Sequence, residues 1–150
     1  MPKPLRGVLA IAHTPFTEAD EIDAAALRRA VDWAFAVGAD GLGGGMVSET
    51  FRLTGDERVS LTEMLVGFAA GRGPVFAAVG AESTKQAVAF AVAAEKAGCD
   101  AVMAVPPLTS RPSEAHLVDH FRALADAVGI PVIVQDASGY VGQSIPIPVC

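Results

Sequence analysis

Apolar runs of strand character alternate with amphipathic stretches of helix character along this 150-residue chain. Small and branched residues predict buried strands at 7–12, 40–45, 74–79, 100–105 and 131–135. Between these runs, apolar residues recur at helical spacing over 23–38, 54–70, 83–97 and 113–129. Each helix returns the chain to start another parallel strand, so the carboxyl ends of all five strands are expected on one face.

The alternation constrains the fold to a barrel segment. An ordered β/α series closes after eight repeats, usually in about 250 residues. The expected fold class is therefore α/β, a (β/α)8 TIM barrel, with residues 1–150 as the N-terminal part of a single domain: (β/α)4 plus strand five. The first and fifth strands would have unpaired edges, and the concave inner face is expected to be exposed to solvent. An isolated monomer should then either self-associate or be loosely packed.

Composition excludes several classes of partner. Only 19% of residues are charged, and the net charge of −6 comes from scattered acids. Without a cluster of Lys and Arg, no nucleic-acid partner is expected. The chain shows neither a membrane-spanning run nor a signal peptide, and no disulfide framework is expected from its two cysteines, Cys99 and Cys150. A cytoplasmic protein is expected.

The second predicted strand, 40–45, is rich in glycine. Glycine within a strand weakens it and often marks close approach by another backbone or by a ligand. The triplet 43–45 lacks both the lysine of a phosphate-binding P-loop and the spaced glycines of a dinucleotide site. Glu49 follows, and it has two readings: a carboxylate that orders the loop by accepting backbone amides, or one that contacts substrate.

Other polar residues also fall at the expected strand ends. Asp136 has the same two readings as Glu49, whereas Gln135 is expected to line a pocket because its amide needs partners. Ser48 and Thr50 are either turn residues or ligands. His13 either touches substrate or is satisfied by a nearby carbonyl.

A histidine pair with metal-ligand spacing lies on the fourth helix. His116 and His120 are four residues apart, but no carboxylate completes a metal-binding motif there. They are expected to be a surface pair on an outer helix, and no metal is expected.

A series of motifs runs along nearly the whole chain. In order, these are Thr14-Pro15-Phe16, Val37-Gly-Ala-Asp-Gly-Leu42, Leu53-Thr-Gly-Asp-Glu-Arg58, Val79-Gly-Ala-Glu-Ser-Thr84, Ala97-Gly-Cys-Asp-Ala-Val-Met-Ala-Val-Pro-Pro107, Arg111-Pro-Ser113 with His120-Phe121, and Ile130-Pro-Val-Ile-Val134. In these motifs and their spacing the chain resembles the dihydrodipicolinate synthase and N-acetylneuraminate lyase family, pyruvate-dependent class I aldolases built on eight-fold β/α barrels.

The resemblance implies a lyase, an aldolase or dehydratase, that acts on a 2-keto acid or sugar acid. In the family, a lysine on strand six forms a Schiff base with pyruvate. The only lysines here are Lys3, Lys85 and Lys96, none of them at the end of an inner strand. The imine-forming lysine is therefore expected beyond Cys150. The resemblance also implies a homo-oligomer, and no cofactor is expected.

The family's loop and relay motifs are altered in this sequence. Its Gly-Thr-Thr-Gly-Glu-Ser loop aligns with 45–50, where Met46 and Val47 can still present amides to a carboxylate although Val47 cannot relay a proton. Gln135 replaces the relay tyrosine, and Tyr140 replaces the carboxylate-binding arginine. At 108–109, Leu and Thr replace the family's tyrosine pair. The expected substrate-binding residues are Gly45, Met46, Val47, Ser48, Glu49, Gln135 and Asp136. These losses indicate a divergent branch.

Three functional hypotheses follow from the sequence. The first is the N-terminal part of a 2-keto-acid lyase whose lysine lies beyond this chain. The second is a catalytically inactive half-barrel that binds a carboxylate or a partner chain. The third is a fragment with no separate role.

Overall fold

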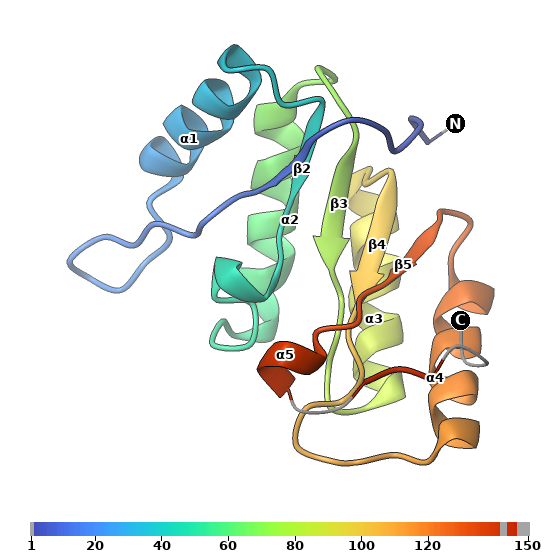
Figure 1. Cartoon of the computed structure of the whole chain (residues 1–150). Coiled ribbons are helices and arrows are strands. Elements are labelled where there is room, and N and C mark those ends of the chain that lie inside the picture. The colour runs from blue at the N-terminus through green and yellow to red at the C-terminus, as the bar shows by residue number, and fades with distance from the viewer. Residues whose placement is uncertain (1, 142–143, 147–150) are drawn as a thin grey trace.

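The structure, a computed structural model, describes residues 2–141 and 144–146. Its elements are β1 (Leu9–Ile11), α1 (Ala24–Ala36), β2 (Gly41–Gly43), the 3-10 helix η1 (Met46–Ser48), α2 (Gly55–Ala69), β3 (Val75–Ala78), α3 (Thr84–Ala97), β4 (Ala101–Ala104), α4 (Glu114–Ala127), β5 (Val132–Val134) and α5 (Ser138–Val141). The five strands form one sheet in the order β1-β2-β3-β4-β5 (Figure 1). All four neighbouring pairs are parallel, as predicted.

Each strand is shorter than its predicted run. In each predicted run, only the middle three or four residues form the strand. Strand pairing also depends on the neighbouring strand, and the apolar pattern of one segment does not show where that neighbour begins and ends. The helices start where their capping residues predict. Asp23, Ser83 and Ser113 each accept an amide of the first turn, and Thr54 forms a capping box with Glu57. The fourth helix ends at Ala127 rather than near residue 129, since Val128 is already extended.

Alternate residues of each strand face two different cores. Leu42, Ala77 and Val102 face the helices and belong to the large cluster that includes Leu27, Leu65 and Leu124. Phe76, Ala101 and Met103 lie in a smaller cluster, on which Leu5, Leu9 and Ile133 pack.

The prediction of a solvent-exposed inner face is wrong for its centre. Phe76 is 3% exposed and Met103 8%, because Leu5 of the N-terminal segment packs on this cluster. Ile11, near the carboxyl end of β1, is 37% exposed. Exposure on this face therefore occurs near the strand ends, where a site is expected.

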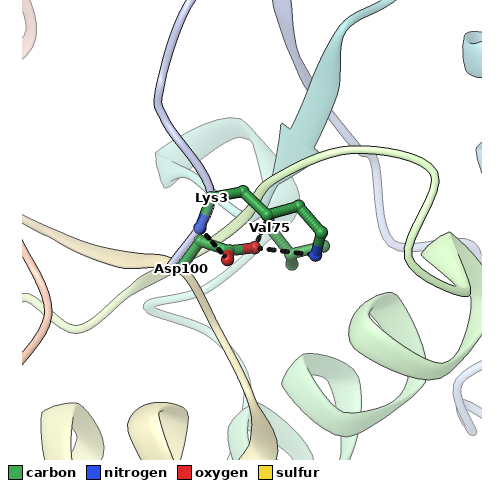
Figure 2. A network of polar contacts seen from close by, with 3 residues as sticks. All are labelled: Lys3, Val75 and Asp100. Carbon is green, nitrogen blue, oxygen red and sulfur yellow. Dashed lines mark hydrogen bonds and ion pairs between the residues drawn. The ribbon is translucent and has the colours of Figure 1, made fainter. Parts of the chain in front are cut away.

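Asp100 ties the N-terminal segment to the amino end of the sheet (Figure 2). Its carboxylate accepts the Lys3 amide at 2.6 Å and the Val75 amide at 3.0 Å, and its Oδ2 lies 3.5 Å from Lys3 Nζ. Asp100 itself is 5% exposed. These contacts hold residues from three segments together at the end of the sheet opposite the expected site.

The predicted surface pair of histidines is wrong for His120. This residue is 3% exposed, its Nδ1 lies 2.9 Å from Thr84 Oγ1, and its ring packs edge-on against Phe121. It lies on the same stripe of α4 as Leu117, Phe121 and Leu124, which is the buried face. Burial lowers the pKa of His120, which favours the neutral ring. His116 is exposed, as predicted.

Two further observations bear on the sequence-based expectations. Within residues 2–141 and 144–146, no helix is both long enough and apolar enough to span a bilayer. Cys99 is a buried free thiol, and burial together with the charge of Asp100 raises its pKa to about 12. Cys150 lies outside the described residues.

Candidate functional site at the strand ends

An open cavity of about 180 Å³ lies at the carboxyl ends of the strands. Its lining residues come from four segments: Ile11 from β1, Gly45, Met46 and Val47 around η1, Met103 from β4, and Gln135 after β5. Four of the seven predicted binding residues are thus brought together, and three, Ser48, Glu49 and Asp136, are not among the lining residues. Ile11 and Met103 are not among the residues predicted from the sequence. Both residues could have been predicted, because they alternate with helix-facing residues near the ends of their strands and so point to the inner face.

Buried hydroxyl groups fix the loop that follows β2. Ser48 Oγ accepts the Gly45 amide at 2.9 Å and donates to the Ala12 carbonyl. Thr14 Oγ1 donates to the Ser48 carbonyl, and Thr50 Oγ1 donates to the Gly45 carbonyl, both at 2.6 Å. Because Ser48 and Thr50 are buried and bonded within the loop, their geometry favours the turn-residue reading.

Two consecutive backbone amides in this loop have no acceptor among the described residues. Neither the Met46 nor the Val47 amide donates a hydrogen bond to any residue in the described part of the chain. Both residues line the cavity, and Val47 is 51% exposed. Consecutive free amides on a rigid loop are fixed dipoles suited to an anion such as a carboxylate.

Glu49 turns away to order the loop. It adopts the left-handed conformation with φ 60°, its carbonyl accepts the Arg52 and Leu53 amides, and its carboxylate pairs with the Arg52 guanidinium. It does not line the cavity. The arrangement favours the loop-ordering reading over substrate contact.

Gln135 and Asp136 are adjacent but have different surroundings. The Gln135 amide donates to the Ala104 carbonyl at 2.9 Å, which extends the pairing of β5 with β4 and leaves the side chain at the cavity. Asp136 accepts the Ser138 amide at 2.8 Å and the Ile145 amide at 3.2 Å. The hydrogen bonds from Ser138, then that from Ile145, hold the pKa of Asp136 below its usual value. The side chain of Tyr140 lies outside the described part of the structure.

The basic and imidazole side chains considered as candidates lie elsewhere. His13 is exposed and does not line the cavity. Lys3 is held by Asp100 near the amino end of the sheet, while Lys85 and Lys96 are exposed on α3. No lysine of this sequence therefore reaches the cavity. Within the described ranges, no three His, Cys, Asp or Glu side chains are grouped to hold a metal ion.

Arg58 and Glu82 support the loops near the site, and neither was predicted from the sequence as a site residue. Arg58 Nη2 donates to the carbonyls of Ala78 and Gly80, each at 3.0 Å, at the end of β3. Glu82 accepts the amides of Leu108 and Thr109 and the Thr109 hydroxyl, which joins two neighbouring loops. Partial burial opposes ionisation of Glu82, but these bonds outweigh it and hold the pKa below its usual value. The burial of Arg58 could have been predicted, because it lies on the same face of α2 as Leu61 and Leu65.

Comparisons with known proteins agree on one family. The model of the dihydrodipicolinate synthetase family matches residues 4–149. 4-Hydroxy-tetrahydrodipicolinate synthase of Methylobacterium radiotolerans is 43% identical over 131 residues, 87% of this chain and 44% of that protein. The enzyme of the same name from Bradyrhizobium diazoefficiens is 40% identical over 130 residues, 86% of this chain and 44% of that protein.

Solved structures show the same fold. YagE, a prophage protein of the dihydrodipicolinic acid synthase family from E. coli K12, solved with pyruvate, superposes with a TM-score of 0.92 at 25% identity, over 95% of this chain and 48% of that one. The 4-hydroxy-tetrahydrodipicolinate synthase of Methylacidiphilum fumariolicum SolV gives 0.93 at 28% identity, over 97% and 49%. The fold prediction is confirmed: the chain is (β/α)4 of a TIM barrel plus a fifth strand. It spans about half the length of the proteins it matches or slightly less.

Proposed function

This chain belongs to the dihydrodipicolinate synthetase family, and from that premise we propose that it forms the carboxylate-binding side of a lyase site for a 2-keto acid. One observation carries the proposal. The cavity at the strand ends is lined by Met46 and Val47, whose amides have no acceptor among the described residues, and by Gln135.

Five of the six residues that line the cavity have a role in the proposed complex. The substrate carboxylate accepts hydrogen bonds from the Met46 and Val47 amides. The Gln135 amide, which both donates and accepts, orients a keto or hydroxyl oxygen. Ile11 and Met103 supply apolar walls for the carbon chain. Ser48 holds the loop in place from behind, so the amides are positioned before substrate arrives.

The bond-making step needs an amine that these residues do not supply. In a class I aldolase or dehydratase, a lysine amine condenses with the keto carbon, loses water, and forms an imine that activates the neighbouring carbon. Since Lys3, Lys85 and Lys96 all lie away from the cavity, we propose that the amine comes from polypeptide outside these 150 residues. The homo-oligomeric state and the cytoplasmic location expected from the sequence remain parts of this proposal.

The side chains at the relay positions favour a substrate other than that of the synthase itself. Val47 has no polar side-chain atom, and an amide such as that of Gln135 does not shuttle protons as a phenol does. The Thr109 hydroxyl is engaged by Glu82 at 2.6 Å. The relatives are synthases by name, so we propose the same imine chemistry on a different 2-keto acid, hydroxy acid or sugar acid.

The positions of the lysines also favour a second candidate function. A half-barrel with this cavity and no amine nearby would bind a carboxylate, or a partner chain, without turnover. Both candidates require that the cavity bind a carboxylate, and they differ only in whether an imine forms. The first experiment therefore tests binding.

A pyruvate titration followed by backbone NMR tests the proposed site. The amide signals of Met46 and Val47 are expected to shift with a common dissociation constant, together with the side-chain amide of Gln135. Gln135→Glu, which places a negative charge beside the carboxylate, should weaken binding at least about tenfold. The matched control Gln86→Glu, on the exposed face of α3, should bind as the unmodified chain does. Shifts confined to other residues, or equal effects of the two variants, would refute the site.

A further inference from the structure

The wall of the cavity at the strand ends is almost entirely apolar. Apart from Gly45 and the polar Gln135, the residues that line it in the described part of the chain carry apolar side chains: Ile11, Met46, Val47 and Met103. None of these residues is charged. This wall therefore offers no charged side chain to pair with a second carboxylate or with an amine of a substrate.

The tips of two of these side chains converge on Gly45. A Cβ atom built on Gly45 would lie 3.2 Å from Ile11 Cγ2, 3.5 Å from Ile11 Cδ1 and 3.6 Å from Met103 Cε. The space beside the Gly45 Cα atom is therefore bounded by methyl groups. A hydroxyl group placed there would lose hydrogen bonds to water without gaining a partner from these methyl groups.

The hydroxyl groups of the neighbouring loop residues are already bonded to the protein. Ser48 Oγ accepts the Gly45 amide and donates to the Ala12 carbonyl. Thr50 Oγ1 donates to the Gly45 carbonyl, and Thr14 Oγ1 donates to the Ser48 carbonyl. All three hydroxyl-bearing residues are buried, and none of them lines the cavity. They therefore offer nothing to a polyhydroxylated substrate.

Met103 is supported on the side away from the cavity. It is 8% exposed and belongs to the inner-face cluster with Phe76, on which Leu5 and Ile133 pack. Because packed interiors contain few voids into which a side chain could move, a polar substrate does not readily displace Met103. The apolar wall is thus a fixed part of the fold.

The cavity also has room beyond pyruvate. Its volume of about 180 Å³ corresponds to roughly a dozen water-sized groups at about 10–15 Å³ each. Pyruvate carries a single methyl group besides its keto and carboxylate groups, and so it leaves part of this volume unfilled.

We propose that the site takes an alkyl 2-keto acid with a longer chain than pyruvate, such as 2-oxobutanoate, in preference to a hydroxylated sugar acid or a dicarboxylic keto acid. The inference rests on the proposed function, in which the Met46 and Val47 amides bind the carboxylate and Gln135 orients the keto oxygen. The alkyl chain extends past Gly45, between Ile11 and Met103. Each methylene group that is buried against these methyl groups strengthens binding.

Titrations with pyruvate, 2-oxobutanoate, 3-hydroxypyruvate and 2-oxoglutarate, followed by backbone NMR, test the substrate class. 3-Hydroxypyruvate matches 2-oxobutanoate in size but carries a hydroxyl in place of the terminal methyl. The dissociation constant read from the Met46 and Val47 amides should be about twofold to fourfold lower for 2-oxobutanoate than for pyruvate. It should be at least about fivefold higher for 3-hydroxypyruvate and for 2-oxoglutarate than for 2-oxobutanoate.

A substitution in the wall tests which side chain sets this preference. Ile11→Thr places a hydroxyl group at the cavity, so it should narrow the ratio between 3-hydroxypyruvate and 2-oxobutanoate at least about twofold. The matched control Val8→Thr makes the same exchange of an apolar for a hydroxyl-bearing side chain at a residue that is 65% exposed and does not line the cavity. It should keep the ratio of the unmodified chain.

The titrations separate the failure of this inference from that of the proposed function. If none of the four keto acids shifts the Met46 and Val47 amides, both fail. If these amides shift but 2-oxobutanoate binds no tighter than pyruvate, 3-hydroxypyruvate or 2-oxoglutarate, the proposed function stands and the alkyl class is wrong. Equal ratios in Ile11→Thr and Val8→Thr would overturn the role of the Ile11 wall.

Discussion

At the scale of single residues, Ser48 fixes the conformation of the loop that lines the candidate site. Its hydroxyl accepts the Gly45 amide and donates to the Ala12 carbonyl, and the residue is fully buried. Ser48→Ala leaves both groups without this partner, so the free energy of unfolding should fall by about 1–3 kcal/mol in urea titrations. Ser110→Ala, at an exposed serine, is the control. Equal stabilities of the two variants would show that the hydroxyl does not hold the loop.

Asp136 should make stability depend on acid pH. Its folded-state pKa is depressed by the amides it accepts, so its contribution to stability is present above about pH 4, near the unfolded value, and is lost as pH falls through the folded value. Between about pH 4 and pH 2, the free energy of unfolding of Asp136→Asn should therefore fall less than that of the unmodified chain. Chemical unfolding at each pH measures this difference. Asp126→Asn, at an exposed residue of α4, should leave the acid limb unchanged. The same fall in unfolding free energy over this pH range in Asp136→Asn and in the unmodified chain would contradict this role.

Residues differ in how far their roles could be predicted from the sequence. Gln135 was placed at a pocket because its position followed from the end of a strand. Glu49 and Asp136 kept two readings, because which groups a carboxylate contacts depends on loop conformation. The surface location predicted for His120 was wrong because only its four-residue spacing from His116 was considered. Its position on the same helix face as Leu117, Phe121 and Leu124 was not.

At the scale of elements, the glycines of β2 serve close packing. A Cβ atom at Gly43 would lie 2.3 Å from the Phe76 carbonyl oxygen and 2.6 Å from its ring. Gly43→Ala should therefore force β2 from β3 and cost about 1–3 kcal/mol of unfolding free energy. The adjacent Gly44→Ala, whose Cβ meets nothing within 4 Å, is the matched control and should fold normally. Similar losses in both variants would indicate a general intolerance of the loop.

The helices were easier to predict than the strands. Asp23, Thr54, Ser83 and Ser113 are local signals, since each caps an amide three residues away. Strand bounds depend on partners far away in the sequence, and so the predicted runs extended beyond the ladder. The unusual glycines were recognised, but the ring of Phe76 that requires Gly43 became evident only from the register of β2 and β3.

At the scale of the whole molecule, β1 and β5 each pair with only one strand among the described residues, so both edges of the sheet are open there. Unpaired edges promote association, and Ile11 is exposed at one of them. Sedimentation velocity should show association that increases with concentration. Ile11→Lys should reduce it, whereas Val37→Lys, at an exposed residue just after α1, should not. A strictly monomeric chain at every concentration would contradict the open-edge account.

The central claim is that this chain supplies the carboxylate-binding side of an imine-forming site but not the imine-forming lysine. Borohydride reduction in the presence of pyruvate, followed by intact-mass and peptide analysis of the 150-residue chain, tests this most directly. The expected result is no pyruvate adduct on any lysine, even at pyruvate concentrations that shift the Met46 and Val47 amides. A saturable adduct on Lys3, Lys85 or Lys96 would contradict the claim.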